Sequence, residues 1–150
     1  MKNIFAILAF IIFLISCSSH KSRNEADKRA TITVSILPQK TFVQKISGDD
    51  FDVQLLIPPG ASPATYTILP SQIRDIIRSK VWFRIGHIEF EHSWGEKIRQ
   101  ANPQMKVVDL SEGLDLIKSE HDHGIESGAG IDPHIWMSPA LVKQFTHKIV

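Results

Sequence analysis

Segments with the pattern of short β-strands alternate with segments of helical periodicity along most of this 150-residue chain. β-branched and aromatic side chains dominate the predicted strands, which cover residues 31–37, 53–57, 81–85 and 106–110. Between them, apolar side chains recur every three or four residues, as on one face of a helix. Strands separated by helices pair in parallel, so the alternation predicts an α/β fold with a parallel sheet covered by helices.

The helical stripes identify the residues that should face the core. The expected inward positions are Phe42, Val43 and Ile46, then Ile73, Ile76 and Ile77 after an N-cap at Ser71, then Phe90, Trp94 and Ile98. Glu91 and His92 fall outside the last of these stripes, so we expect them on the helix surface. A further helix is predicted to begin with Ser138 as N-cap and Pro139 as its first residue.

The amino-terminal end has the features of an export signal. A short start with one lysine precedes an apolar run, residues 4–15, that is too short to span a bilayer comfortably as a helix. The run closes on Ser16-Cys17 and looks like a bacterial lipoprotein signal. This implies that residues 1–16 are removed, that the Cys17 thiol is lipidated and that residues 17–30 form a flexible tether. The alternative is an ordinary signal peptide or membrane anchor with an incidental cysteine.

Composition excludes several classes of function. Lys plus Arg number 17 against 16 Asp plus Glu, so no basic field indicates a nucleic-acid partner. Cys17 is the only cysteine, which rules out a disulfide and, once it carries lipid, thiolate catalysis or a cysteine-type zinc site. The chain has no Gly-x-Ser-x-Gly elbow, no His-Glu-x-x-His and no phosphate-binding glycine loop. We therefore expect a protein that is not an enzyme.

The candidate ligand residues follow the strands. Ligands of parallel sheets bind beyond the carboxyl ends of the strands, which here are residues 60–66, residues 86–92 and the loop that reaches His134. His134 is the best metal-ligand candidate, because prolines restrict its backbone and Trp136 can pack behind a zinc-binding imidazole. His87 or Glu89 is a second candidate. The alternative for His134 is a histidine that is only hydrogen-bonded within its loop.

A second cluster of possible ligands lies in the polar loop before His134. His121, Asp122 and His123 follow Glu120 within a segment that also holds glycine and serine. Such a tract can scavenge divalent metal weakly. The alternative is a solvated surface loop.

Three motifs then occur in order: Pro59-Gly60-Ala61-Ser62-Pro63, Pro70-Ser71-Gln72 and Asp132-Pro133-His134-Ile135-Trp136-Met137-Ser138-Pro139. Together they resemble the zinc/manganese substrate-binding lipoproteins of ABC importers, over residues 31–150. The resemblance implies a receptor that captures zinc or manganese for a membrane permease. It also implies two (β/α)4 lobes joined by one long helix, with the metal held between them.

The resemblance carries over to single positions. The amino-terminal lobe of the family gives two histidines to the metal, and His134 corresponds to the second. The first would stand at Ala64, which cannot coordinate a metal, so His87 or Glu89 could substitute. The same resemblance implies that residues 31–137 form the amino-terminal lobe and residues 138–150 the truncated start of the linking helix.

The second lobe is then absent from this chain, and it could be encoded separately. On that reading, Phe145 and Ile149 would be exposed where another lobe normally covers them. Two alternatives stay open. One is a truncated or split gene product with little or no transport activity, and the other is a surface adhesion protein of the same family.

Overall fold

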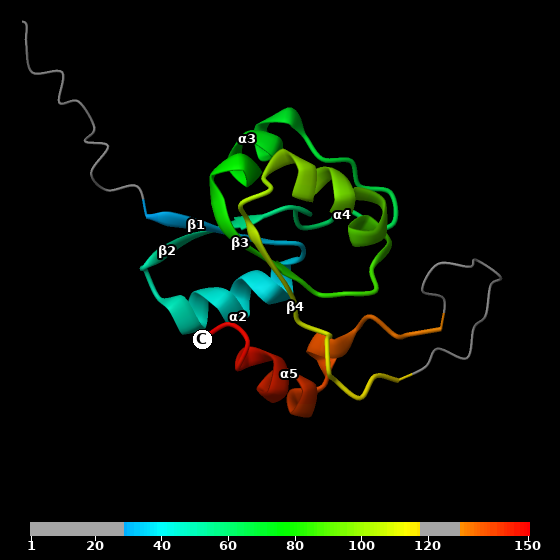
Figure 1. The fold of residues 1–150 in the computed structure, drawn as a ribbon. Coiled ribbons are helices and arrows are strands. Elements are labelled where there is room, and N and C mark those ends of the chain that lie inside the picture. Colours follow the sequence, from blue (N-terminus) through cyan, green and yellow to red (C-terminus); the bar gives the residue numbers. More distant parts are fainter. Residues whose placement is uncertain (1–28, 118–129) are drawn as a thin grey trace, which may run out of the picture.

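The computed structural model describes residues 29–117 and 130–150, and these contain one sheet of four parallel strands (Figure 1). The strand order is β2-β1-β3-β4, with bounds β1 (Ala30–Val34), β2 (Phe51–Leu55), β3 (Ser79–Arg84) and β4 (Lys106–Asp109). The helices are α2 (Leu37–Ser47), α3 (Pro70–Arg78), α4 (Glu89–Ala101) and α5 (Pro139–Thr146), and the short 3-10 helix η2 (Ile135–Met137) precedes α5. The predicted α/β fold with a parallel sheet is confirmed.

Helices cover both faces of the sheet. Figure 1 shows α3 and α4 on one face and α2 and α5 on the other. The neighbouring strands β1 and β3 send the chain in opposite directions, because β1 leads to β2 at one edge and β3 leads to β4 at the other. Such a switch point opens a crevice beyond the carboxyl ends of the two strands, and ligands of α/β proteins bind there.

The first strand is shorter than predicted, because a helix begins inside the expected strand. β1 ends at Val34 and α2 already begins at Leu37. Pro38 lies in the first turn of α2, where its missing N–H has no helical partner to lose. The side chain of Gln39 fixes this start, since its Oε1 accepts a hydrogen bond from the Ile36 backbone N–H at 3.0 Å.

Helix α3 also begins earlier than predicted. Its N-cap is Leu69 and its first residue is Pro70, so the expected N-cap at Ser71 is wrong. Gln72 supplies the capping interaction instead, because its Oε1 accepts from the Leu69 backbone N–H at 2.9 Å. On the inward face Ile76 is fully buried, whereas Ile77 is 55% exposed, and its predicted inward position is wrong.

The interior is one apolar cluster that includes a side chain from α5. Phe145 is fully buried and meets Phe42 of α2 edge to face, with ring centroids 5.5 Å apart. Ile149 is half-buried against the same cluster, so the expectation that both residues would be exposed is wrong. The N-cap prediction for this helix is confirmed, since Ser138 Oγ accepts from the Leu141 backbone N–H at 3.5 Å.

Residues 1–28 and 118–129 lie outside the described part of the chain. The predicted signal segment, the lipidation site at Cys17, most of the tether and the loop residues His121, Asp122 and His123 therefore fall outside it as well. Within residues 29–117 and 130–150, no helix combines the length and apolar character that crossing a membrane requires.

The packing of α5 predicts a large stability effect at Phe145. We expect Phe145→Ala to lower the free energy of unfolding by about 3–5 kcal/mol, because it leaves a cavity against Phe42. The matched control is Ile77→Ala, which truncates an exposed side chain and should stay within about 0.5 kcal/mol of the parent. Urea titrations of the full chain measure both changes. Equal losses for the two variants would contradict the observed docking of α5.

Candidate functional site

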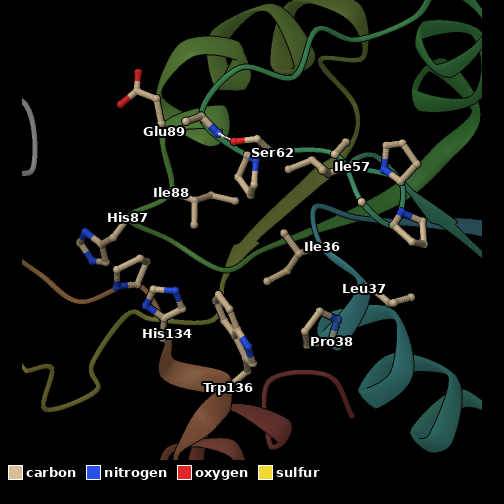
Figure 2. A pocket seen from close by; sticks show the side chains of 17 residues that line it. Ile36, Leu37, Pro38, Ile57, Ser62, His87, Ile88, Glu89, His134 and Trp136 are labelled. Atoms are coloured by element: carbon tan, nitrogen blue, oxygen red, sulfur yellow. Dashed lines mark hydrogen bonds between the residues drawn. The ribbon is translucent and has the colours of Figure 1, made fainter.

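A pocket of about 560 Å³ lies beyond the carboxyl ends of β1 and β3, at the switch point of the sheet (Figure 2). Four segments line it: residues 36–38 after β1, residues 57–64 after β2, residues 87–89 after β3, and the loop with Pro133, His134 and Trp136. The structure thus brings the three segments with predicted ligand positions to one place. Most of the lining is apolar, and the candidate donors gather at one side.

His134 is held in a defined orientation by its neighbour in the loop. Its Nδ1 lies 2.6 Å from Asp132 Oδ1, and its backbone N–H donates to the same oxygen at 2.9 Å. An ionised carboxylate can only accept, so Nδ1 carries the hydrogen, and in the neutral imidazole Nε2 then keeps its lone pair. The imidazole is 60% exposed. This arrangement leaves Nε2 accessible to a metal, with Asp132 as the outer partner that orients the ring.

The same contacts keep Asp132 ionised. The backbone N–H of His134 and then its ring hold the pKa of Asp132 below its ordinary value. Trp136 packs against the imidazole, with ring centroids 5.0 Å apart and a tilt of 57°. The predicted packing of Trp136 against His134 is thus present in the structure (Figure 2).

His87 enters the pocket from the turn between β3 and α4. It is half-buried, and its backbone φ of 52° is the one positive value at a non-glycine position among residues 29–117 and 130–150. Such a conformation costs about 1–3 kcal/mol and persists only where the surrounding structure enforces it. Figure 2 shows the imidazoles of His87 and His134 at the same side of the pocket.

The surroundings of this turn do enforce it. Glu91 Oε1 accepts from the Ile85 backbone N–H at 2.9 Å, and Oε2 accepts from the Gly86 backbone N–H at 2.8 Å. Gly86 has a φ of 79°, and a Cβ at this position would overlap Ser111 Oγ. Both ends of the turn are therefore fixed by contacts that leave little freedom to relax the His87 backbone.

Glu91 was expected on the helix surface, and that prediction is wrong. The residue is 2% exposed, and burial raises the pKa of its carboxyl, although the hydrogen bonds and the charge of Arg84 act in the opposite direction. Glu91 is the third residue of α4, the position from which an acidic side chain reaches back to the N–H groups before a helix. An acidic residue at the third position of a predicted helix was therefore the sequence signal that could have predicted this buried capping role. His92 is exposed, as expected.

The other predicted positions contribute less to the pocket. Glu89 is exposed, accepts a hydrogen bond from Ser93 Oγ at 3.0 Å and points away from both histidines (Figure 2). Ala64 lines the pocket but offers no donor, and its backbone N–H is bound by Ser62 Oγ at 3.3 Å. Within the described ranges, no three His, Cys, Asp or Glu side chains lie close enough together to hold a metal ion. The pocket therefore presents imidazoles from two loops and no complete metal centre.

The fold and this pocket define an α/β protein with a parallel sheet and a crevice at its switch point. The family model described as "ZnuA: Zinc-uptake complex component A periplasmic" matches residues 32–150. The chain belongs to this family, which confirms the resemblance predicted from its motifs. Members of the family are solute-binding proteins and not enzymes.

Individual relatives agree with this assignment. The Bacillus subtilis high-affinity zinc uptake system protein ZnuA is 28% identical, over 99% of this chain and 51% of its own length. The Streptococcus mitis manganese ABC transporter substrate-binding lipoprotein PsaA is 24% identical, over 92% of this chain and 45% of its own length. A crystal structure of a ZnuA deletion mutant with zinc bound superposes with a TM-score of 0.71, at 37% identity over 80% of this chain and 44% of that one. The chain thus spans about half the length of these relatives.

The constraint on the β3–α4 turn predicts opposite effects for two glycines. We expect Gly86→Ala to destabilise the fold by more than about 1 kcal/mol, because alanine disfavours a φ of 79° and would overlap Ser111. Gly95→Ala is the matched control inside α4, where a Cβ would meet Trp82 at an ordinary 3.8 Å. It should stabilise the helix by about 0.5–1 kcal/mol. Denaturant unfolding of the two variants gives the sign of each change in the free energy of unfolding. A Gly86→Ala variant as stable as the parent would contradict the tight turn.

Proposed function

We propose that this chain is the metal-capturing lobe of an extracytoplasmic solute-binding protein that serves an ABC-type zinc or manganese importer. The observation that carries the proposal is the orientation of His134, whose Nδ1 is engaged by Asp132 and whose Nε2 has no hydrogen-bond partner among residues 29–117 and 130–150. Its position at the switch point of the sheet supports the same role. The lobe binds a metal ion as cargo and does no chemistry on it.

The proposal assigns roles along the chain. Residues 31–137 form the metal-binding lobe, and residues 138–150 begin the connection to a second lobe. Cys17 carries the lipid that anchors the protein to the membrane beside the permease, and the residues between Cys17 and β1 act as its tether. His121, Asp122 and His123 form an accessory loop that scavenges metal.

Donor chemistry favours zinc for the part of the site that this lobe supplies. The pocket offers imidazole nitrogens, which suit zinc, whereas additional carboxylate ligands would shift the preference towards manganese. The nearest carboxylates do not compete for this role. Asp132 is engaged by His134, and Glu89 is bound by Ser93 and points away from the histidines.

Removing the His134 ring tests the proposal. We expect His134→Ala to weaken zinc binding by the full 150-residue chain, purified in detergent, by at least about tenfold, because it deletes a direct ligand. Isothermal titration with zinc measures the affinity. The matched control is His147→Ala, an exposed histidine just after α5, which should bind as the parent does. If the His134 and His147 variants bound zinc equally well, or the parent bound none, the proposal would fail.

The role of Asp132 gives a separate prediction. Asp132→Asn keeps an acceptor for the His134 backbone but loses the charge that holds Nδ1–H, so we expect roughly tenfold weaker zinc binding. The nitrogen chemical shifts of the His134 ring should also show a mixture of tautomers before zinc is added. Asp115→Asn is the control, since Asp115 is exposed and outside the pocket. A single unchanged tautomer in Asp132→Asn would contradict the assigned role.

A further inference from the structure

One imidazole does not hold a metal ion in competition with water and other chelators, so the lining of the pocket should contain a second donor. Zinc sites in proteins use three or four ligands from side chains, sometimes with water in the last position. Among the lining residues, the side chains able to coordinate a metal are Ser62, His87, Glu89 and His134. The question is which of the first three can join His134.

Two of the three are committed elsewhere. The Ser62 hydroxyl accepts a hydrogen bond from the Ala64 backbone N–H at 3.3 Å, and a neutral hydroxyl is a weak zinc ligand. The Glu89 carboxylate accepts from Ser93 Oγ at 3.0 Å within α4 and points away from His134 (Figure 2). His87 remains, and its ring lies on the same side of the pocket as that of His134.

The backbone at His87 supplies an independent argument. A histidine is held at a φ of 52°, a left-handed conformation that glycine adopts without a Cβ penalty. The turn is enforced from both sides, by the Glu91 carboxylate on two backbone N–H groups and by the close approach of Gly86 to Ser111. Strain that the surrounding structure maintains in this way is concentrated at binding and catalytic sites. Glycine would fit this turn with less strain, so we expect the imidazole of His87 to have a function of its own.

We infer that the His87 imidazole is a second metal ligand. From the β3–α4 turn, it binds the same ion as His134. This inference rests on the proposed function of the pocket. The ion then joins the β3–α4 turn to the loop before η2, two segments that approach each other at the switch point of the sheet. Glu91 is a positioning residue in this arrangement, since it fixes the turn that carries His87 and does not touch the ion.

Substitutions that suit the turn but lack an imidazole separate the ligand role from a structural one. His87→Gly and His87→Asn both tolerate a positive φ, so the folded protein should be as stable as the parent or more stable. We expect both variants to bind zinc at least about tenfold more weakly, which is the smallest loss typical for residues that support a metal. His92→Asn is the matched control, because it makes the same change at an exposed histidine of α4.

Zinc titration of the full chain in detergent, with denaturant unfolding in parallel, measures both quantities. Ring-nitrogen NMR spectra provide a direct readout, since the signals of His87 and His134 should both shift on zinc addition while that of His92 stays in place. The inference is overturned if His87→Gly binds zinc like the parent, or if only His134 responds to zinc. Those results leave the proposed function intact. The proposed function itself fails if His134→Ala binds zinc as well as its His147→Ala control does, or if the parent binds none.

Discussion

Where β1 and β3 end side by side, backbone groups that leave the sheet need new partners, and two buried side chains provide them. Gln39 accepts hydrogen bonds from two consecutive N–H groups after β1 and donates to the Phe83 carbonyl in β3, each at 3.0 Å. Glu91 accepts from two consecutive N–H groups after β3. Leaving a buried N–H unpaired costs about 1–3 kcal/mol. The two pocket segments that follow β1 and β3 thus depend on these two side chains.

This constraint explains why the pocket keeps its shape next to an open surface. A buried carboxylate is costly unless it is paired and hydrogen-bonded, and Glu91 meets this condition with both oxygens and with Arg84 Nε at 3.6 Å. The Trp82 indole donates to Ser35 Oγ at 3.1 Å and joins the same region. These polar contacts beneath the pocket fix the backbone of the β3–α4 turn, which carries His87. The residues that stabilise this turn are therefore buried beneath the pocket and are not part of its lining.

The sequence predicted the parallel sheet because strand and helix patterns alternate, and the structure confirms it. It also predicted that Trp136 packs against His134, and the two rings do lie together; the ligand role of His134 stays a prediction. The sequence did not predict contacts that depend on three-dimensional arrangement. The helical pattern places Glu91 on the surface, but in the fold the β3–α4 turn brings two backbone N–H groups to its carboxylate. The same kind of pattern places Ile77 in the core, but in the fold this side chain of α3 faces outwards. Phe145 was expected to be exposed unless a second lobe covered it. The fold shows instead that α5 packs against α2, where Phe145 contacts Phe42. Periodicity reports which faces are apolar, but tertiary contacts decide which of them are covered.

The exposure of the two histidine loops bears on how such a site would handle a metal ion. A structural zinc site encloses its ion with four protein ligands, whereas a catalytic zinc site keeps one position open. Here the His134 ring is 60% exposed, and most of the remaining lining is apolar and cannot coordinate. An ion bound by His134 and one further imidazole would keep coordination positions open to water or to donors outside the pocket. Such an arrangement would suit the capture and release of a metal ion. The fixed donors would select the ion, and the open coordination positions would let it leave.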